Sequence, residues 1–326
     1  MAEMNPAGFL GDVEATPVSL VRLADAIDRD LLGLDRLRLG DADRVLLLGM
    51  GSSAYAAGVV AARLRSLGVS AVAELASSAL LPPATPGTLV LAVSASGGSA
   101  ETLAATRQYA GRCRVVAVTD VPGSPVGEAA DAVVGLLSGP EPGGVSCRSY
   151  RHTVAVLLAV AEQLAPGTAP GLAAHCRRAA ESTATLLDAR SQWLPDVARH
   201  LDGPLGCWVV GPAARLASAQ QSALMLREGP RVPAHAAETG DWSHVDVYLT
   251  RTIDYRMLLL PGSAWDGELL RWTTERGSTV VSVGGPVAGG RYDVGYDGQD
   301  VPDVALLTET TVAELVAHRW WAAQQS

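Results

Sequence analysis

The sequence contains no lysine, because all 25 residues counted as Lys or Arg are arginines. It also has a single phenylalanine, Phe9, among 326 residues. A base composition biased toward arginine codons would produce this pattern, so the absence of lysine need not have a functional cause. The chemical consequence is nevertheless strict. Neither a lysine Schiff base nor the Gly-Lys-Ser/Thr motif of nucleotide-binding loops can form from this chain.

Paired cysteines and clustered positive charge are also missing. The four cysteines, Cys113, Cys147, Cys176 and Cys207, are widely spaced and form no C-x-x-C pair. This predicts reduced thiols rather than a zinc site or a disulfide framework, and no metal or cofactor is expected. The net charge is −9 and the arginines are scattered, so nucleic-acid binding is not expected either.

Long apolar runs are absent as well. No stretch approaches the roughly 18 uninterrupted apolar residues of a membrane span, and the N-terminus lacks a signal-peptide pattern. The composition is 48% hydrophobic and 18% charged, which favours a compact protein, and we expect it to be soluble and cytoplasmic without membrane partners. At roughly 150 residues per domain, the length predicts about two domains.

Apolar runs of strand length alternate with helical segments, which is the pattern of parallel sheets covered by helices. A Pro/Gly/Ala-rich patch at 166–171 interrupts the alternation, which then starts again. The predicted strands cover residues 44–50, 88–96, 115–121, 131–137, 206–211, 256–262 and 279–285. We therefore expect a leader and first domain at 1–170, a linking helix at 171–199 and a second domain at 200–326.

Two predicted strand-to-helix turns, 51–53 and 94–99, are rich in serine and glycine. In open parallel sheets, ligands bind at the carboxyl ends of strands, where the next helix presents free backbone N–H groups. Serine hydroxyls add donors, so a phosphate can bind here without lysine. Neither turn is a GxGxxG or Walker sequence, which disfavours nucleotides. The alternative is that the serines cap helices, as Ser99 before Glu101 suggests.

Three segments in this order and spacing resemble the first sugar isomerase (SIS) domain of glucosamine-6-phosphate synthases and phosphosugar isomerases: VLLLGMGSSAYAA, LAVSASGGSAETLAA and VVAVTDVPGSPVGEAAD. SALMLREGPRVPAHAAETGDWSHVDVYL resembles the second SIS domain. The resemblance implies an α/β fold of two doubly wound parallel-sheet SIS domains, each a flavodoxin-like three-layer α/β/α sandwich. Because the leader begins near residue 10, the synthase's glutaminase domain and glutamine-dependent amination are not expected.

The family resemblance also implies a sugar-phosphate site. Ser53, Ser94, Ser96 and Ser99 match its phosphate contacts, while Gly51 and Ser52 shape the loop. Ala95 and Gly98 replace a phosphate-contacting glutamine and an acidic residue of the synthase. Val145 and Cys147 match the loop that lines the sugar, with Cys147 in place of a serine. The alternative for Cys147 is a small packed core residue.

Glu228 matches the family's catalytic glutamate and His244 its ring-opening histidine. Moving a carbonyl between C1 and C2 requires a base, and a carboxylate in a partly dry pocket suits this task. Ring opening needs a group that exchanges protons near neutral pH, as histidine does. Outside the family context, a solvated glutamate and a structural histidine are the commoner interpretations. Glu238 and Asp241 either orient His244 or are exposed.

Met225 stands where the synthase has a lysine, and the chain ends before the family's C-terminal lysine tail. In this it resembles the fructosamine-6-phosphate deglycases of the family. Aldose–ketose isomerisation and amine release from an amino or fructosamine sugar phosphate both remain open. A sugar-phosphate sensor without turnover is the rival hypothesis. The resemblance implies a homodimer in which the histidine reaches a neighbouring subunit's site, and Trp320–Trp321 is either a packing face or a subunit contact.

Overall fold

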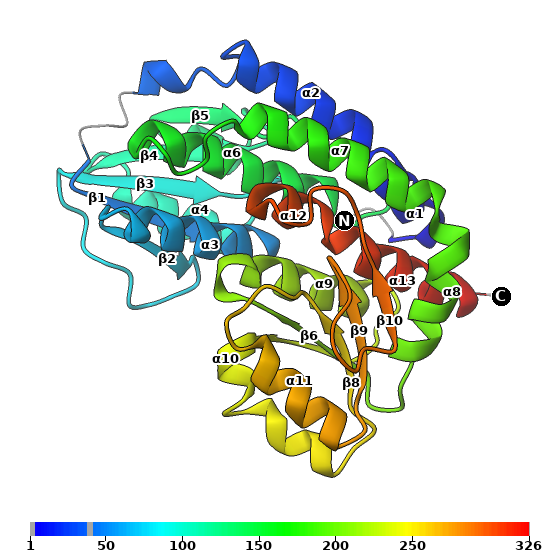
Figure 1. The fold of residues 1–326 in the computed structure, drawn as a ribbon. Coiled ribbons are helices and arrows are strands. Elements are labelled where there is room, and N and C mark those ends of the chain that lie inside the picture. Colours follow the sequence, from blue (N-terminus) through cyan, green and yellow to red (C-terminus); the bar gives the residue numbers. More distant parts are fainter. Residues whose placement is uncertain (1–3, 38–41, 326) are drawn as a thin grey trace. The chain divides into compact units, whose positions relative to one another are not determined.

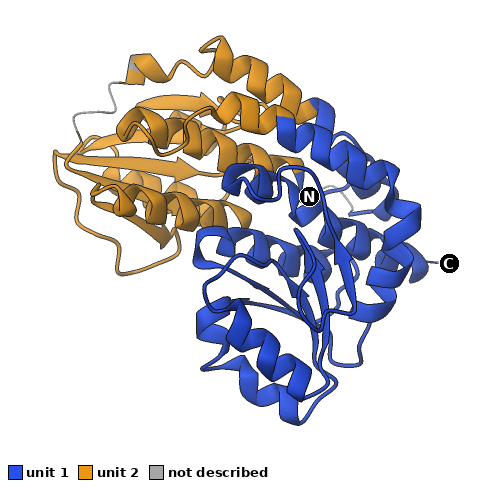
Figure 2. Cartoon of the chain, viewed as in Figure 1, with its two compact units in different colours: residues 1–18, 141–147, 178–326 blue, residues 19–140, 148–177 orange. Residues whose placement is uncertain are grey.

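The computed structural model describes residues 4–37 and 42–325. Figure 2 shows two compact units, each assembled from separate stretches of the chain. Unit 1 comprises Met1–Val18, Glu141–Cys147 and Arg178–Ser326, and unit 2 comprises Ser19–Pro140 and Arg148–Arg177. Two short segments from the first half of the sequence therefore belong to the same unit as its second half.

Unit 2 is built on a five-stranded parallel sheet of order β2-β1-β3-β4-β5 (Figure 1). Its strands are β1 (Arg44–Gly49), β2 (Ala71–Leu75), β3 (Thr88–Val93), β4 (Arg114–Thr119) and β5 (Ala132–Gly135). Its helices are η1 (Leu34–Leu37), α3 (Ser52–Ser66), α4 (Ala100–Tyr109), α5 (Pro125–Glu128) and α6 (Arg148–Leu164), while α2 (Thr16–Asp28) and α7 (Leu172–Asp188) contain residues of both units.

Unit 1 contains a second five-stranded parallel sheet, of order β10-β9-β8-β6-β7. Its strands are β6 (Cys207–Gly211), β7 (Ala234–Glu238), β8 (Arg256–Leu259), β9 (Thr279–Val283) and β10 (Tyr292–Val294). Its helices are α1 (Pro6–Glu14), α8 (Arg190–Leu201), η3 (Ala213–Arg215), α9 (Leu216–Glu228), α10 (Thr239–Trp242), η4 (Asp246–Arg251), α11 (Asp266–Glu275), α12 (Pro302–Thr308) and α13 (Thr310–Ala323).

The predicted fold class is confirmed. When the strands are numbered along each unit, both sheets have the order 2-1-3-4-5, which is the doubly wound flavodoxin-like order. β1 and β3 are buried almost throughout because helices cover both faces, which explains their continuous apolar sequences. β2, β7 and β10 were not predicted. Each lies at a sheet edge and is only partly buried, so none has the apolar run of a central strand.

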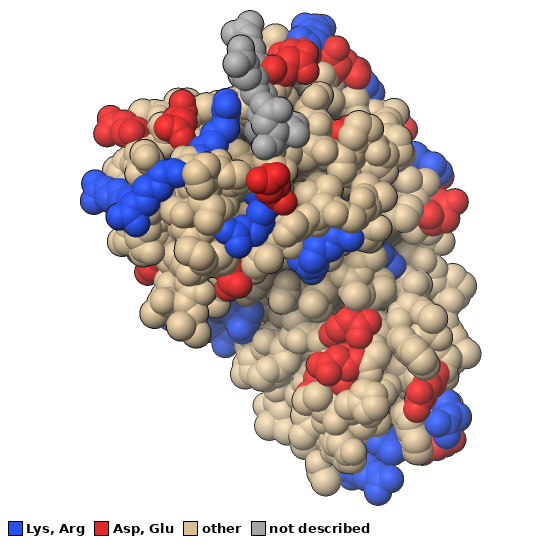
Figure 3. Space-filling model, turned by 90° about the vertical axis from the view of Figure 1, so that its left-hand side faces the viewer, with Lys and Arg blue, Asp and Glu red and all other residues tan. Residues whose placement is uncertain are grey.

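The region between the two sheets along the chain forms two helices rather than a single linking helix. α7 ends at Asp188 and α8 begins at Arg190, with a turn at Ala189. In the part of the chain that the structure describes, no helix combines the length and apolar character needed to cross a membrane. On the face shown in Figure 3, arginines and carboxylates are interspersed.

Candidate functional site

The two serine-rich turns of unit 2 leave the sheet side by side. β1 and β3 are parallel neighbours, with Leu48 paired to Ala92, so residues 50–53 and 94–99 both lie at the carboxyl end of the sheet. β1 and β3 are also the two strands between which the strand order 2-1-3 changes direction. Ligands of doubly wound sheets bind at this point, outside the carboxyl ends of the strands.

The first turn leaves the beginning of α3 open. Gly51 precedes the helix with φ of 51°, a conformation that glycine adopts at little cost, and it makes no side-chain capping bond. A Cβ added to Gly51 would meet no atom within 4 Å. Ser52 and Ser53 are half-buried in the first helical turn. The first N–H groups of a helix have no partner within it and carry partial positive charge, which suits an anion. In this structure the Ser53 N–H donates to the Met50 carbonyl at 3.1 Å, a bond that a ligand would have to replace.

The second turn is held by the end of the next strand. The Ala95 carbonyl accepts hydrogen bonds from Asp120 N at 3.0 Å and Thr119 Oγ1 at 3.1 Å. Gly97 has φ of 63°, and a Cβ there would lie 1.8 Å from Ser124 Oγ. Glycine is therefore required for this backbone path. Ser94 is buried, whereas Ser96 is exposed.

Ser99 caps α4, as the alternative interpretation proposed. Its hydroxyl accepts from Thr102 N at 3.2 Å and donates to Glu101 Oε2 at 3.0 Å. Hydrogen bonds from its own backbone and then from Ser99 lower the pKa of Glu101. The ionised Glu101 is exposed, so solvent and salt screen its repulsion of an anion at this turn. Ser99 must exchange its bond to Glu101 for one to phosphate if it is to bind a ligand.

Glu228 is the last residue of α9 in unit 1 and is half-buried. Burial raises the pKa of its carboxyl, and the neighbouring Arg227 partly offsets this effect. A carboxylate with a raised pKa is a better proton acceptor near neutral pH than a fully solvated one. The environment of Glu228 therefore suits a general base.

His244 lies in an exposed turn after α10. Its backbone N–H donates to the Asp241 carbonyl at 2.9 Å. The Glu238 carboxylate accepts from Gly240 N at 2.7 Å and Asp241 N at 3.0 Å, so it caps α10. His235, the nearest other histidine in sequence, stacks on Trp208 with ring centroids 5.4 Å apart.

The fold places Glu228 and His244 at opposite ends of β7. β6 and β7 are parallel, so α9 between them must run back to the edge where strands begin. Glu228 lies at that end, whereas His244 follows the other end of β7. Five residues of strand at about 3.3 Å each separate the two levels by roughly 15 Å. The side chains of Glu228 and His244 of a single copy therefore do not lie next to each other.

The loop 141–147 packs within unit 1. Val145 and Cys147 are both buried, as the packed interpretation of Cys147 expects. The Cys147 thiol donates to Glu141 Oε1 at 3.3 Å, and its backbone N–H donates to the same oxygen at 2.8 Å. Gln221 on α9 donates to the Ser146 carbonyl at 2.7 Å.

Glu141 and Gln221 were missed by sequence reasoning. Gln221 lies seven residues before Glu228 on α9, a spacing of about two helical turns that places both near one face. That spacing was the available signal. The partner of Gln221 is a backbone carbonyl far away in sequence, and nothing in the local sequence indicates it.

A metal site has no support among the described side chains. Across residues 4–37 and 42–325, no group of three or more His, Cys, Asp and Glu is arranged to hold a metal ion.

Comparison with known proteins gives one family match and similarity over most of the chain. Residues 38–163 match the SIS domain family. An isomerizing glutamine–fructose-6-phosphate aminotransferase of Aeropyrum pernix is 27% identical over 258 residues, covering 75% of this chain and 42% of the relative. The chain therefore spans about two fifths of that relative's length.

Solved structures extend the similarity of fold to nearly the whole chain. The C-terminal domain of glucosamine-fructose-6-phosphate aminotransferase from Francisella tularensis has a TM-score of 0.80 at 16% identity, covering 97% of this chain and 95% of that one. Tagatose-6-phosphate ketose/aldose isomerase from Escherichia coli has a TM-score of 0.74 at 18% identity, covering 95% and 92% respectively. Residues 38–163 thus match the SIS domain family, in a chain that is similar in sequence to these aminotransferases over three quarters of its length.

Proposed function

We propose that this chain is a sugar-phosphate isomerase that moves a carbonyl between C1 and C2 of its substrate, with Glu228 as the base. The observation that carries the proposal is the raised pKa of Glu228, half-buried at the end of α9, in a chain that contains a SIS domain. The names of the similar isomerase and aminotransferases support a phosphorylated sugar as the substrate class.

The phosphate binds at the edge of the unit 2 sheet that carries the serine-rich turns. The first turn of α3, which has no side-chain cap, supplies backbone N–H groups together with the hydroxyls of Ser52 and Ser53. Ser94, Ser96 and Ser99 add hydroxyls from the neighbouring turn. Serine hydroxyls and helix N–H groups bind phosphate oxygens without a cationic side chain. Binding there leaves the sugar carbon atoms free to extend away from the sheet.

The reaction proceeds through an enediol. Glu228 takes the proton from C2 of the open-chain aldose, and the electron pair of that C–H bond forms the C1–C2 double bond while the C1=O1 pair moves to O1, which takes a proton from solvent. The ketose forms when the O2–H proton leaves, a C2=O2 bond forms, and the C1–C2 pair takes the proton back from Glu228 at C1. No lysine is present in this chain, so its own side chains cannot form an imine with the sugar. Met225, which is buried one turn before Glu228, has no nucleophile to offer.

His244 opens the sugar ring in the site of a second copy of the chain. The separation along β7 keeps His244 away from Glu228 of the same copy. Apolar side chains beside His244 are exposed, with Val245 at 58% and Tyr248 at 67% of their accessible surface. Exposed apolar groups of this kind mark interaction surfaces. They support a homodimer that buries this turn against its partner.

Val145 and Cys147 shape the sugar-binding end of α9 through their loop rather than through their buried side chains. Gln221 is a positioning residue in this scheme, because its bond to the Ser146 carbonyl ties the loop to the helix that carries Glu228. Glu141 closes the same loop by holding Cys147.

Release of an amine from an amino or fructosamine sugar phosphate is the second candidate function. The absence of lysine is compatible with it, as with the isomerisation, because a substrate that carries its own amine needs no imine with the protein. Glu228 takes the proton from the amine-bearing carbon next to the carbonyl, and the carbonyl oxygen takes a proton from solvent, which gives an enaminol. Protonation of the former carbonyl carbon then gives an imine at the amine-bearing carbon. Water then adds to the resulting imine carbon, and the amine departs.

A substrate panel separates these functions. The protein is incubated with aldose, ketose, amino-sugar and fructosamine phosphates, and carbonyl migration and free amine are followed by NMR. Carbonyl migration without amine release supports the isomerase, and amine release supports the second candidate. Binding without any turnover would make the chain a sugar-phosphate sensor and contradict both enzymatic proposals.

A further inference from the structure

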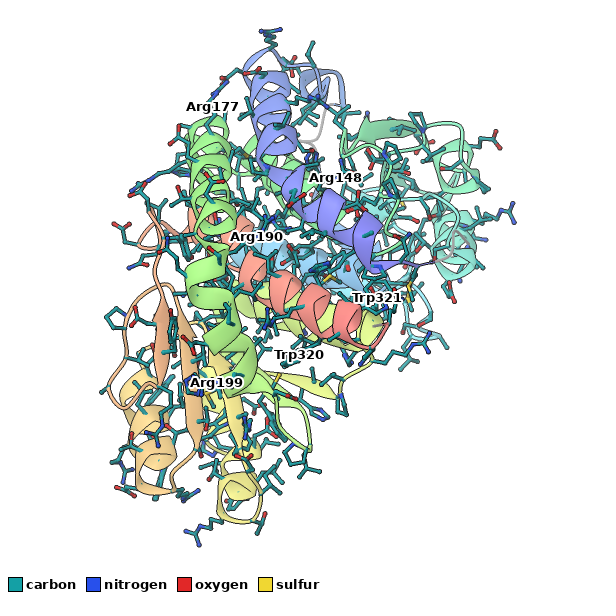
Figure 4. All side chains as sticks on the ribbon, turned by 90° about the vertical axis from the view of Figure 1, so that its right-hand side faces the viewer. Arg148, Arg177, Arg190, Arg199, Trp320 and Trp321 are labelled. Carbon is teal, nitrogen blue, oxygen red and sulfur yellow. The ribbon has the colours of Figure 1, made fainter. Side chains whose placement is uncertain are left out.

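Unit 1 contains a groove of about 570 Å³ that the proposed function does not use. It is formed by α1, α8 and α13, and Figure 4 shows α8 and α13 with Arg190, Arg199 and Trp320 labelled. This volume lies within the roughly 300–1,000 Å³ of small-molecule sites. None of the residues proposed to bind or convert the sugar phosphate lines it.

The floor of the groove is apolar. Leu10 of α1, Leu194 of α8 and Leu315 and Trp320 of α13 line it. Trp320 is half-buried, whereas Trp321 is buried and packs on Phe9 with ring centroids 6.1 Å apart. Of the two neighbouring tryptophans, Trp321 is therefore part of the core. Trp320 is available to a ligand.

The groove also has a cationic side. Arg190 and Arg319 line it, and Arg319 is exposed. Arg190 forms an ion pair of 2.8 Å with Glu14, but over residues 4–37 and 42–325 no carboxylate lies within ion-pairing distance of Arg319. His318, which precedes Arg319, is half-buried. Burial and, to a smaller extent, the charge of Arg190 lower the pKa of its imidazole. A neutral imidazole there still has an N–H to donate.

These features together define the kind of molecule that fits. An apolar floor favours an aliphatic chain or an aromatic ring over a polar sugar. The Arg319 guanidinium, which pairs with no carboxylate of residues 4–37 and 42–325, favours an anionic head group, because charge-assisted hydrogen bonds are stronger than neutral ones. This local positive charge stands out on a chain whose net charge is −9.

We propose that the α1/α8/α13 groove binds a small amphiphilic anion, with its apolar part on Leu194, Leu315 and Trp320 and its head group on Arg319 and Arg190. Carboxylate and phosphate head groups share the required chemistry. The ligand is a small molecule rather than a second copy of the chain.

The probe is 8-anilinonaphthalene-1-sulfonate, which pairs an aromatic body with a sulfonate, and its fluorescence is titrated against the full chain. We expect saturable binding at one site. Arg319→Gln should weaken it by about five- to tenfold, the loss expected for one charge-assisted contact. Trp320→Ala should weaken it by a similar factor, because the apolar contact with the ring is lost. Arg199→Gln is the matched arginine control on α8, and Trp265→Ala is the matched control at an exposed tryptophan outside the groove. Both controls should bind like the wild type.

Competition identifies the chemistry of the ligand. Octanoate and octyl phosphate should displace the probe, whereas octan-1-ol at the same concentration should not. Equal probe binding by the groove and control variants would overturn the proposal, as would displacement by the alcohol. Sedimentation velocity provides a further test: if Arg319→Gln or Trp320→Ala converts an oligomer to a monomer, the groove is an interface between copies and the proposal fails. Circular dichroism and thermal unfolding check that each variant is folded.

Discussion

The two sheets have the same strand order, but different residues occupy the carboxyl ends of the two strands between which that order changes direction. In unit 2, the ends of β1 and β3 carry glycine and serine, α3 has no side-chain cap, and a Cβ at Gly51 would meet no atom within 4 Å. In unit 1, the corresponding ends of β6 and β8 are closed by the buried Arg215. Its guanidinium donates to the Glu309 carboxylate and to the Pro261 carbonyl.

This difference shows that strand topology provides a position for a ligand, but local side chains decide whether it is open. In unit 1 the Arg215–Glu309 ion pair lies where a ligand would bind, and the Arg215 guanidinium is already neutralised by Glu309. Burial raises the pKa of Glu309, and Arg215 acts in the opposite direction. Unit 1 instead offers Glu228, at the opposite edge of its sheet. The proposed phosphate-binding residues therefore belong to unit 2, and the proposed base belongs to unit 1.

The largest expected effect comes from Glu228→Gln, which keeps the shape of the side chain and removes the base. Turnover should fall by about 10²- to 10⁴-fold, the usual contribution of general base catalysis, with little change in sugar-phosphate affinity. Steady-state kinetics and equilibrium binding measure the two quantities. Glu275→Gln is the matched control, since Glu275 is the exposed last residue of α11. Unchanged turnover in Glu228→Gln would show that unit 1 does not supply the base.

The closed edge of unit 1 is tested by Arg215→Met. Removing one partner leaves Glu309 buried without its cation, so the free energy of unfolding should fall by about 3–5 kcal/mol. Arg199→Met breaks the exposed pair with Asp196 and should cost about 1 kcal/mol or less. Urea denaturation measures both. The double variant Arg215→Met/Glu309→Leu should recover part of the loss. A small effect of Arg215→Met would mean that the pair does not stabilise this edge.

Unit 2 should lose stability in acid because of His152. Burial lowers the pKa of His152 from 6.5 to about 4, and its ring lies 2.7 Å from Ser19 Oγ and 2.8 Å from the Leu136 carbonyl. Since the folded state binds this proton more weakly than the unfolded state, stability falls as the pH drops from about 6.5 toward 4. The full loss is about 3 kcal/mol. NMR titration of the imidazole and urea denaturation at several pH values measure it. A titration of His152 near 6.5 would contradict the prediction.

The smallest expected effect concerns the shape of the second serine turn. Gly97→Ala introduces a Cβ where Ser124 Oγ lies at 1.8 Å, whereas Gly111→Ala introduces one into open space at a similar positive φ of 71°. Both variants bear backbone strain of about 1 kcal/mol. Only Gly97→Ala should also displace the turn and weaken sugar-phosphate binding, as calorimetry measures. Equal affinity in the two variants would separate this turn from the phosphate site.

The central strands and helices could be predicted from sequence because their signals are local. β1 and β3 are continuous apolar runs, and α6 is a long segment without a helix breaker. Edge strands such as β7 carry no such run, because one side of an edge strand has no neighbouring strand to bury it. The turn at Ala189, which separates α7 from α8, is marked by neither glycine nor proline.

The site residues show the same limit. The sequence pattern indicated that Ser99 either binds phosphate or caps a helix, and the structure decided that its hydroxyl caps α4 and donates to Glu101. The pattern also put Glu228 and His244 in one short segment, sixteen positions apart. Only the path of the chain through α9 and β7 shows that Glu228 and His244 lie at opposite ends of the same strand.

The sequence by itself determined which chemistry this chain's side chains cannot perform, because a chain without lysine cannot form a lysine imine in any fold. It also determined the class of fold, since buried parallel strands require continuous apolar runs. The tertiary structure decided what lies at the carboxyl ends of the two strands where each sheet's order changes direction: a turn without a side-chain cap in unit 2, and Arg215 in unit 1. The position of Arg215 depends on its contact with Glu309, ninety-four positions away in the chain, which no local pattern encodes.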